Sequence, residues 1–411
     1  MEISNGPTLV LLPSTARKMS DAGTSNSEPC ILGLSLIERA ALAARRAGYG
    51  RTFLLARDQA APPAVTTGAD WNEVAAALSS QAATLVIAPA TIVVEPEWLM
   101  RLARMPIASA VWATIPDRIA VLADTEVPDA LSLLQEDGGA LDMTAVEQRL
   151  GRRFGSPAAV PAGVDPLIVA TSEDIPAAER RLLGSLVKDT DGFMTRHVDR
   201  RISLQISRRL APTGITPTQV TVISLVIGLL GASFFLSTHW FWQTAGALLF
   251  LLHSIVDGCD GELARLKFQE SKFGGLLDFW GDNVVHVAIF ACLALGWASS
   301  TAATWPLWLG AAAIIGTLGS AGLVYWKQLR PKEGGGPLFT SVAGVRDDRL
   351  SRMLDAASRR DFVYGVPILA LFGKANWFLL LAAVGAPIFF LLLVILALRE
   401  RMQSKTLTSA T

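Results

Sequence analysis

The chain of 411 residues has little cysteine and no excess of charge. Its three cysteines, Cys30, Cys259 and Cys292, are odd in number and lack the paired spacing of metal sites. A disulfide framework is therefore not expected, and the thiols are interpreted as free. Lys and Arg total 36, as do Asp and Glu, so the formal net charge is zero. This balance gives no sign of a nucleic-acid partner, and none is expected.

The sequence also lacks a secretory signal, because no basic segment followed by an apolar one opens it. Apolar residues are abundant at 51%, and beyond about residue 210 they form runs of the roughly 20 residues that cross a bilayer. The length allows two domains. We predict a cytoplasmic domain (1–180), a linker with a juxtamembrane helix (181–215), a membrane domain (216–400) and a cytoplasmic tail (401–411).

Six membrane helices are predicted, although the fifth is short and five is the alternative. Lys and Arg gather on the side of the termini, and Lys374 alone lies on the other side. The positive-inside rule then puts both termini and the site on the cytoplasmic side of a bacterial-type inner membrane. The predicted spans are 217–238, 241–265, 273–296, 305–326, 360–373 and 377–398.

The segment before the first span alternates apolar residues with arginines. Ile202, Leu204, Ile206 and Leu210 are its apolar members. This pattern suits an amphipathic helix on the inner leaflet. An ordinary linker helix is the alternative.

Four aspartates, Asp257, Asp260, Asp278 and Asp282, lie in otherwise apolar helices, where charge is costly. The first pair is spaced i,i+3 and the second i,i+4, so each pair shares one helix face. Two such faces that meet across a short loop would bring the carboxylates together, and these would need a cation. Oxygen ligands favour Mg²⁺, Mn²⁺ or Ca²⁺ over zinc. The alternative is that the aspartates are helix-end residues in water.

Small residues and one cation accompany these carboxylates. Gly261, Ala264 and Gly274 leave room for a bulky ligand beside the helix backbone, and Arg265 offers a planar cation suited to phosphate. Carboxylates, a divalent metal and an arginine together indicate a phosphoryl-transfer site, where catalysis is mostly positioning and charge neutralisation.

The residues spell D-x-x-D-G-x-x-A-R, then eight residues, then G-x-x-x-D-x-x-x-D. This pattern resembles the signature of the CDP-alcohol phosphotransferase family, with no position missing. The resemblance implies six helices around a cytoplasm-facing cavity, and transfer of a phosphate-linked alcohol from a CDP-alcohol to an acceptor hydroxyl with release of CMP.

The resemblance also implies roles for single residues. Two Mg²⁺ ions, or Mn²⁺, would be held by the four aspartates, and Asp282 would be the general base. The residues implied to line the CDP pocket are Asp257, Asp260, Gly261, Ala264, Arg265, Gly274 and Thr218. The segment ITPTQVT resembles a family element written T-P-N-x-x-T, with Thr218 where asparagine is usual.

The first domain alternates apolar strands with amphipathic helices, which predicts an α/β domain with a mainly parallel sheet. Strands are expected at 8–13, 51–57 and 83–89, and helices at 34–50 and from 94. Segments 31–57 and 85–102 resemble nucleotidyltransferases that act on sugar and alcohol phosphates, so the domain is predicted to be nucleotidyltransferase-like, with a Rossmann-like fold.

The chemistry of such enzymes is incomplete here. The loop after the first strand lacks the G-x-G that cradles a triphosphate, and Thr91 stands near the expected metal-binding aspartate. Arg17 and Lys18 are either a remnant of that loop or exposed charges. We therefore expect a degenerate domain kept for stability, assembly as a homodimer, or substrate delivery. The alternative is a bifunctional enzyme that also makes the CDP-alcohol from CTP.

The substrates stay open at this point. The resemblance implies a donor that is either CDP-diacylglycerol, which would enter from the membrane lipid, or a CDP-polyol such as CDP-inositol. The acceptor is an alcohol or a polyol phosphate such as inositol phosphate, because segment 186–203 resembles the linker of inositol-phosphate cytidylyltransferase/di-myo-inositol-phosphate phosphate synthases. Candidate acceptor ligands are Arg200, Arg359 and Arg360, and ordinary positive-inside charges are the alternative.

Two expectations remain, one about three histidines and one about a third possible function. His239, His253 and His286 show no ligand spacing and are assigned none. An ion-coupled transporter is a third functional hypothesis, but the internal repeat that many transporters have is not visible.

Overall fold

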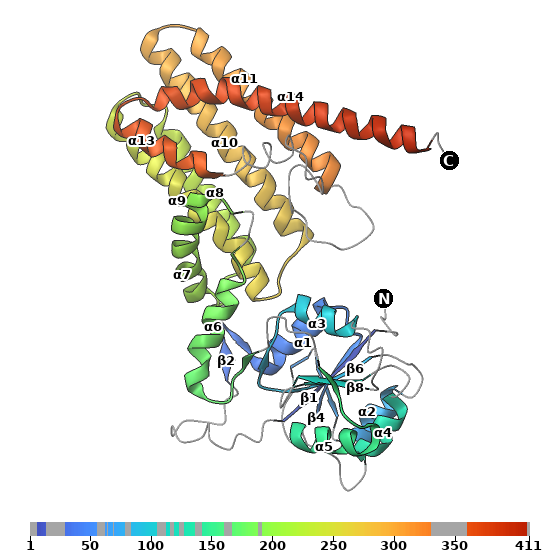
Figure 1. Cartoon of the computed structure of the whole chain (residues 1–411). Helices are drawn as coiled ribbons and strands as arrows, with labels where there is room; N and C mark the ends of the chain where they lie inside the picture. Colours follow the sequence, from blue (N-terminus) through green and yellow to red (C-terminus); the bar gives the residue numbers. More distant parts are fainter. Residues whose placement is uncertain are drawn as a thin grey trace. The chain divides into compact units, whose positions relative to one another are not determined.

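The chain divides into two compact units, Met1–Leu182 and Leu183–Thr411, and each is described by itself (Figure 1). The computed structural model describes residues 6–13, 29–55, 62–63, 65–68, 70–78, 84–104, 112–115, 119–122, 127–135, 142–159, 167–187, 191–329 and 360–408.

The first unit is built on a seven-stranded sheet in the order β10-β8-β9-β6-β1-β4-β5. β1 pairs in parallel with both β4 and β6, whereas β9 runs antiparallel to β6 and β8. The predicted α/β sheet is therefore present, with a parallel centre and antiparallel pairs on one side. Its strands are β1 (Thr8–Leu12), β4 (Arg51–Leu55), β5 (Thr66–Gly68), β6 (Leu85–Pro89), β8 (Trp112–Ile115), β9 (Ile119–Leu122) and β10 (Ala158–Ala159).

Helices cover this sheet, and its apolar strand residues form the core. Val10, Ile87 and Trp112 are buried there together with residues of the covering helices. Two small antiparallel pairs, β2 (Cys30–Ile31) with β3 (Leu34–Ser35) and β7 (Ile92–Val93) with β11 (Leu167–Ile168), lie apart from it. The helices are α1 (Leu36–Arg46), α2 (Trp71–Leu78), α3 (Pro96–Ala103), α4 (Val127–Gln135), α5 (Met143–Phe154) and α6 (Ile175–Gly184).

The second unit is helical. A π-helical turn (Thr195–Asp199) leads into α7, and a 3-10 helix (Arg360–Tyr364) leads into α13. Its α-helices are α7 (Arg200–Leu210), α8 (Pro217–Phe234), α9 (Trp240–Leu266), α10 (Lys272–Thr301), α11 (Trp305–Val324), α13 (Gly365–Leu371) and α14 (Ala375–Thr408).

Four segments among the described residues are long and apolar enough to cross a membrane: Pro217–Phe234, Lys272–Thr301, Trp305–Lys327 and Ala375–Arg399. α9 is also long, with 27 residues, but it contains several charged side chains and is not among these four segments. The predicted fifth span is a 3-10 turn followed by the seven residues of α13, which is short of the roughly 20 that a crossing needs. The structure thus shows four candidate spans where six were predicted.

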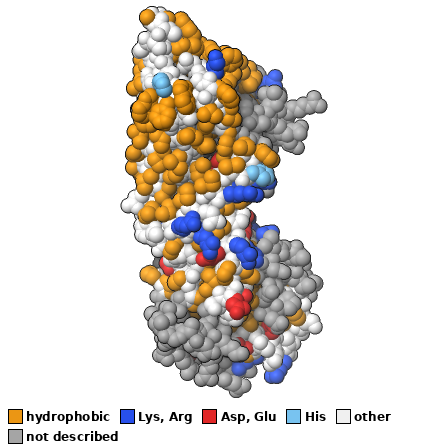
Figure 2. Space-filling view, turned by 90° about the vertical axis from the view of Figure 1, so that its left-hand side faces the viewer, with side chains coloured by type: hydrophobic (Ala, Val, Ile, Leu, Met, Phe, Trp, Pro, Cys, Tyr) orange, Lys and Arg blue, Asp and Glu red, His pale blue; other side chains and the backbone are white. Residues whose placement is uncertain are grey.

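Large apolar side chains are exposed over the helices of this unit, as Figure 2 shows. Trp308 is 75% exposed, Ile315 67% and Leu381 65%. A surface this apolar is unusual for a soluble monomer and suits contact with lipid. Trp305 and Trp377 are also exposed, at the first turns of α11 and α14, where interfacial aromatics are expected.

Glycines let the helices of this unit approach closely. A Cβ atom on Gly246 of α9 would lie 2.7 Å from the carbonyl oxygen of Gly231 in α8. A Cβ atom on Gly316 of α11 would lie 2.5 Å from backbone atoms of Ala386 and Pro387 in α14. Small residues at such crossings are typical of helix packing in membranes.

Candidate metal and phosphate site

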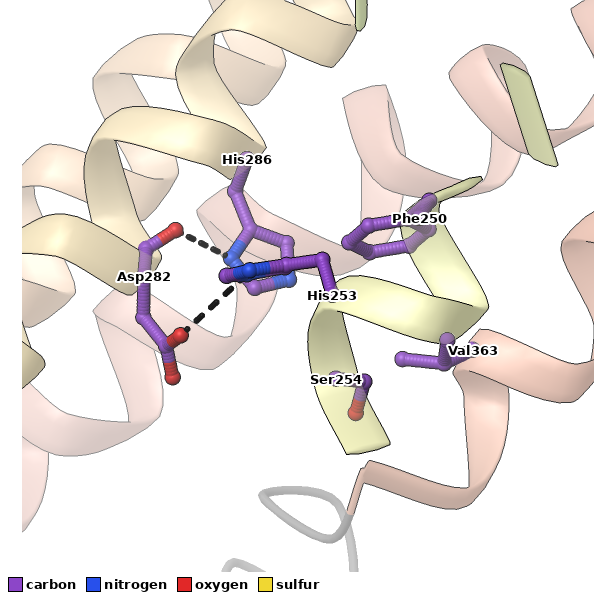
Figure 3. Close-up of a pocket in the computed structure, with 6 residues that line it drawn as sticks. All are labelled: Phe250, His253, Ser254, Asp282, His286 and Val363. Carbon is purple, nitrogen blue, oxygen red and sulfur yellow. Dashed lines mark hydrogen bonds and ion pairs between the residues drawn. The ribbon is translucent and has the colours of Figure 1, made fainter. Parts of the chain in front are cut away.

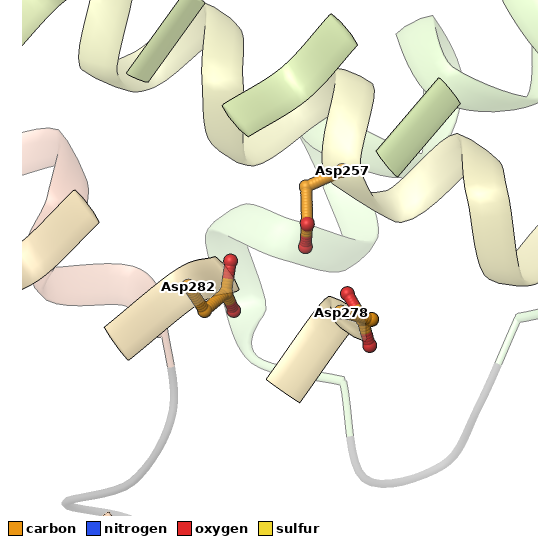
Figure 4. A group of neighbouring side chains, drawn as sticks. All are labelled: Asp257, Asp278 and Asp282. Atoms are coloured by element: carbon orange, nitrogen blue, oxygen red, sulfur yellow. The ribbon is translucent and has the colours of Figure 1, made fainter. Parts of the chain in front are cut away.

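Three of the predicted aspartates converge. Asp257 of α9 and Asp278 and Asp282 of α10 each offer a carboxylate oxygen, and these atoms lie within 4.8 Å of one another (Figure 4). Asp257 is only 3% exposed. Carboxylates this close repel one another unless a cation lies between them. A ligand set made only of carboxylate oxygens fits Mg²⁺ or Mn²⁺.

Asp260 is not part of this three-carboxylate group. It lies one turn further along α9, is 7% exposed, and accepts a hydrogen bond from the hydroxyl of Thr221 in α8. The structure therefore brings together three of the four predicted metal ligands, and it ties the fourth to the neighbouring helix.

The other signature residues lie beside the carboxylates on the same helices. A Cβ atom on Gly261 would lie 3.4 Å from Nη1 of Arg265, so glycine keeps the surface open next to this guanidinium. A different contact explains why residue 274 is a glycine. Its amide donates at 2.9 Å to the hydroxyl of Ser271, which caps α10, and a Cβ atom would come equally close to that hydroxyl. Ala264 is half-buried on α9.

The start of α8 is fixed by a capping box between Thr216 and Gln219, and the half-buried Thr218 lies within it. Lys267, just after α9, holds the chain ahead of this cap. Its ammonium group donates to the carbonyl oxygens of Thr213 and Ile215, at 2.7 and 2.8 Å, and burial lowers its pKa. The element resembling T-P-N-x-x-T is therefore attached to the end of α9.

A buried carboxylate that the sequence analysis did not single out connects α7 to α9. Glu262, with 0% exposure, accepts hydrogen bonds from the hydroxyls of Ser203 and Ser207, each at 2.6 Å. Arg200 donates to it at 2.7 Å and to Asp191 at 2.9 and 3.1 Å. The i,i+4 spacing of the two serines was the available signal, since it places both on one face of α7.

This network shows how α7 lies. Its serine face packs on α9, and Ile202, which was expected to contact the leaflet, is 43% exposed. Burial lowers the pKa of Arg200, but the hydrogen bonds and charges of Asp191 and Glu262 raise it on balance. Acceptor binding by Arg200 stays a prediction, because its guanidinium already has two carboxylate partners. Arg359 and the side chain of Arg360 lie outside the described residues.

Two histidines that were assigned no role lie beside Asp282 (Figure 3). Nε2 of His253 is 3.4 Å from Oδ1 of Asp282, and Nδ1 of His286 is 2.8 Å from the backbone oxygen of Asp282. The signal was spacing, because His253 precedes Asp257 by four residues and His286 follows Asp282 by four. The third, His239, caps α9 instead.

In the first unit, Thr91 lies in the turn between β6 and β7, is 9% exposed, and accepts a backbone hydrogen bond from Val169 at 3.0 Å. The turn itself, Ala90-Thr91, contains no carboxylate. The predicted remnant of the triphosphate loop, Arg17 and Lys18, lies outside the described residues.

Comparison with known proteins shows which proteins this chain is similar to. The chain is 35% identical over 189 residues to the bifunctional IPC transferase and DIPP synthase of Thermococcus kodakarensis, covering 44% of this chain and 41% of that protein. It is 30% identical over 115 residues to the phosphatidylinositol phosphate synthase of Mycobacteroides abscessus, covering 27% and 51%. The matched region thus spans about half or less of the length of these relatives.

A similar solved structure is the phosphatidylinositol phosphate synthase of Mycobacterium tuberculosis with CDP-DAG bound. It has a TM-score of 0.32 and 21% identity, and the match covers 48% of this chain and 91% of that one. Residues 214–400 match the family described as CDP-alcohol phosphatidyltransferase, the range that contains all four signature aspartates. The family resemblance of the signature is confirmed, and the chain carries a CDP-alcohol phosphatidyltransferase domain over residues 214–400.

Proposed function

We propose that this protein is a multi-pass membrane enzyme that transfers a phosphate-linked alcohol from a CDP-alcohol to an acceptor hydroxyl and releases CMP. The observation that carries the proposal is the convergence of Asp257, Asp278 and Asp282 inside a domain that matches this family. An ion-coupled transporter would need aspartates too, but the family match gives it no support.

The residues suggest how the reaction proceeds. Bound to Asp257, Asp278 and Asp282, and with Asp260 nearby, two Mg²⁺ or Mn²⁺ ions would offset charge on the pyrophosphate of the donor. Arg265 contributes a further positive charge beside the open surface at Gly261. Asp282 accepts the proton of the acceptor hydroxyl. The hydroxyl oxygen then bonds to the phosphorus that carries the alcohol, and the bond from this phosphorus to the oxygen of CMP breaks.

The substrate class follows from the relatives. Their names include a phosphatidylinositol phosphate synthase and a bifunctional IPC transferase and DIPP synthase. We therefore assign inositol phosphate as the acceptor, with CDP-diacylglycerol or CDP-inositol as the donor. Mass spectrometry of the products, after the purified chain is incubated with each donor and inositol phosphate, separates the two donors. No product with either donor would reject this substrate assignment.

The proposal includes the membrane arrangement. Together with the four candidate spans, α9 and the segment Phe362–Leu371 would complete six helices around a cytoplasm-facing cavity, and both termini would lie in the cytoplasm. α9 is long enough for this, and its three acidic residues, Asp257, Asp260 and Glu262, are buried rather than exposed to lipid. A homodimer is part of the same proposal, and a cross-linking experiment in membranes tests it.

The bifunctional alternative is favoured by the name of the Thermococcus kodakarensis relative, which three further relatives share. Against it, the turn that should supply a metal-binding carboxylate holds the buried Thr91 instead. We therefore propose that the first unit supports stability or assembly and makes no CDP-alcohol.

A further inference from the structure

Two glycines of α9 form a small patch beside the aspartates. Gly258 lies between Asp257 and Asp260 in the sequence, and Gly261 directly follows Asp260. Because Gly258 and Gly261 are spaced i,i+3, they share one face of the helix. Both are half-buried, so the backbone at this patch is not sealed in the core.

Each glycine lies next to a guanidinium group. A Cβ atom on Gly258 would lie 3.8 Å from Nη1 of Arg200 in α7, and one on Gly261 would lie 3.4 Å from Nη1 of Arg265. Apart from α9 itself, no other atom of the described part of the chain comes within 4 Å of either position. Since Cβ positions at i and i+3 are about 5–6 Å apart, the two arginines border the same patch.

The guanidinium of Arg200 is held from two sides. Its Nε and Nη2 donate to the two oxygens of Asp191, at 2.9 and 3.1 Å, and its Nη1 donates to Oε1 of Glu262 at 2.7 Å. Glu262 is itself fixed by the hydroxyls of Ser203 and Ser207. A side chain held in this way has already lost its conformational freedom, so it loses little more when a ligand binds.

These three hydrogen bonds do not use every donor of Arg200. A guanidinium group has five N–H bonds, so one on Nη1 and one on Nη2 have no acceptor among the described residues. The side chain is 12% exposed. Two N–H bonds on neighbouring nitrogens match two oxygens of a phosphate. Since Asp191 and Glu262 offset the charge of Arg200, the positive charge of the patch comes from Arg265.

We propose that Arg200 and Arg265 together bind a phosphate group of a substrate over Gly258 and Gly261, and that Asp191 and Glu262 are positioning residues for Arg200. This inference rests on the proposed function. The phosphate belongs to the donor or to inositol phosphate, and the experiment distinguishes these two sources. Losing one hydrogen bond to a charged group changes an equilibrium constant by about tenfold or more.

The test compares R200K with the wild type in the purified full chain, with Mn²⁺, CDP-diacylglycerol or CDP-inositol, and inositol phosphate. Lysine keeps the charge but lacks the planar fork that binds two carboxylates and still offers two N–H bonds. We expect R200K to raise the KM of one substrate by about tenfold or more. Calorimetry with CDP and with inositol phosphate then shows which of the two binds more weakly. R201K, at the exposed neighbouring arginine, is the matched control and should leave both KM values unchanged.

Folding of each variant is checked by elution in detergent and by Mn²⁺ binding, which should keep the wild-type affinity. If R200K does not fold, D191N decides, because it keeps the pair of Arg200 with Glu262 and loosens one side of the guanidinium only. D191N should raise the same KM by a smaller factor.

The inference is overturned if a folded R200K, or a folded D191N, leaves both KM values at the wild-type level. It is also overturned if R200K weakens the binding of Mn²⁺ and of both substrates together, which is the result expected if Arg200 only holds α7 on α9. Absence of CMP release by the wild-type chain would instead count against the proposed function.

Discussion

Arg200 and Glu262 form a buried ion pair, with Nη1 of the arginine 2.7 Å from Oε1 of the glutamate. Glu262 has 0% side-chain exposure and Arg200 has 12%. Arg200 also forms an ion pair with Asp191, and Glu262 follows Asp260 by two residues on α9. The pair of Arg200 and Glu262 joins α7 to the C-terminal end of α9.

Substitution E262A should destabilise the protein strongly. It leaves Arg200 and two serine hydroxyls without their buried acceptor, and removing one partner of a buried pair costs about 3–5 kcal/mol. The midpoint of thermal unfolding in detergent should fall clearly below that of the wild type. E173A, at an exposed glutamate, is the control and should leave the midpoint unchanged. Equal midpoints for E262A and wild type would show that the network does not hold α7.

A second prediction concerns the crossing of α11 and α14. G316A should destabilise the helical unit by about 1–3 kcal/mol, because the new Cβ atom would meet backbone atoms of Ala386 and Pro387 at 2.5 Å. Gly322 of the same helix has nothing within 4 Å of such an atom, so G322A should be neutral or slightly stabilising. The difference between their unfolding midpoints is the readout, and no difference would contradict the packing.

Much of this architecture could be predicted from local patterns. Continuous apolar runs located β1, β4 and β6, and the spacing of the aspartates placed Asp257 with Asp278 and Asp282. The number of membrane spans was harder to predict from the sequence. Apolar composition does not show where a helix begins or ends, and the residues from 360 form a 3-10 helix followed by a helix of seven residues.

The parts of the site that the sequence analysis did not predict depend on contacts between distant segments of the chain. Asp260 meets Thr221, 39 residues earlier, and Glu262 meets Ser203, 59 residues earlier. The i,i+4 spacing of Ser203 and Ser207 marks one face of α7, but it does not show that Glu262 is the partner of that face. The pairing of His253 with Asp282 likewise requires knowing which faces of α9 and α10 meet.

A third prediction separates the roles of the aspartates. D257N and D278N should weaken binding of Mn²⁺ and CDP together, because both carboxylates belong to the metal group. D282N should keep most CDP binding and slow the transfer by about 10²–10⁴-fold, the usual contribution of a general base. Calorimetry for CDP and stopped assays for CMP measure the two effects. Wild-type transfer by D282N would place the base elsewhere.

A fourth prediction concerns the first unit. The full chain should release no pyrophosphate from CTP with inositol phosphate, since Thr91 occupies the turn where a metal-binding carboxylate is expected and a hydroxyl cannot neutralise a triphosphate in its place. Pyrophosphate release that disappears when Arg17 and Lys18 are both replaced by alanine would favour the bifunctional alternative.

The most direct test of the central claim measures CMP release by the purified chain with and without a divalent metal. The carboxylates of Asp257, Asp278 and Asp282 lie within 4.8 Å of one another and are expected to work only around a cation. With CDP-diacylglycerol or CDP-inositol and inositol phosphate, CMP should appear with Mg²⁺ or Mn²⁺, stop in EDTA, and return when the metal is restored. Undiminished CMP release in EDTA would contradict the account.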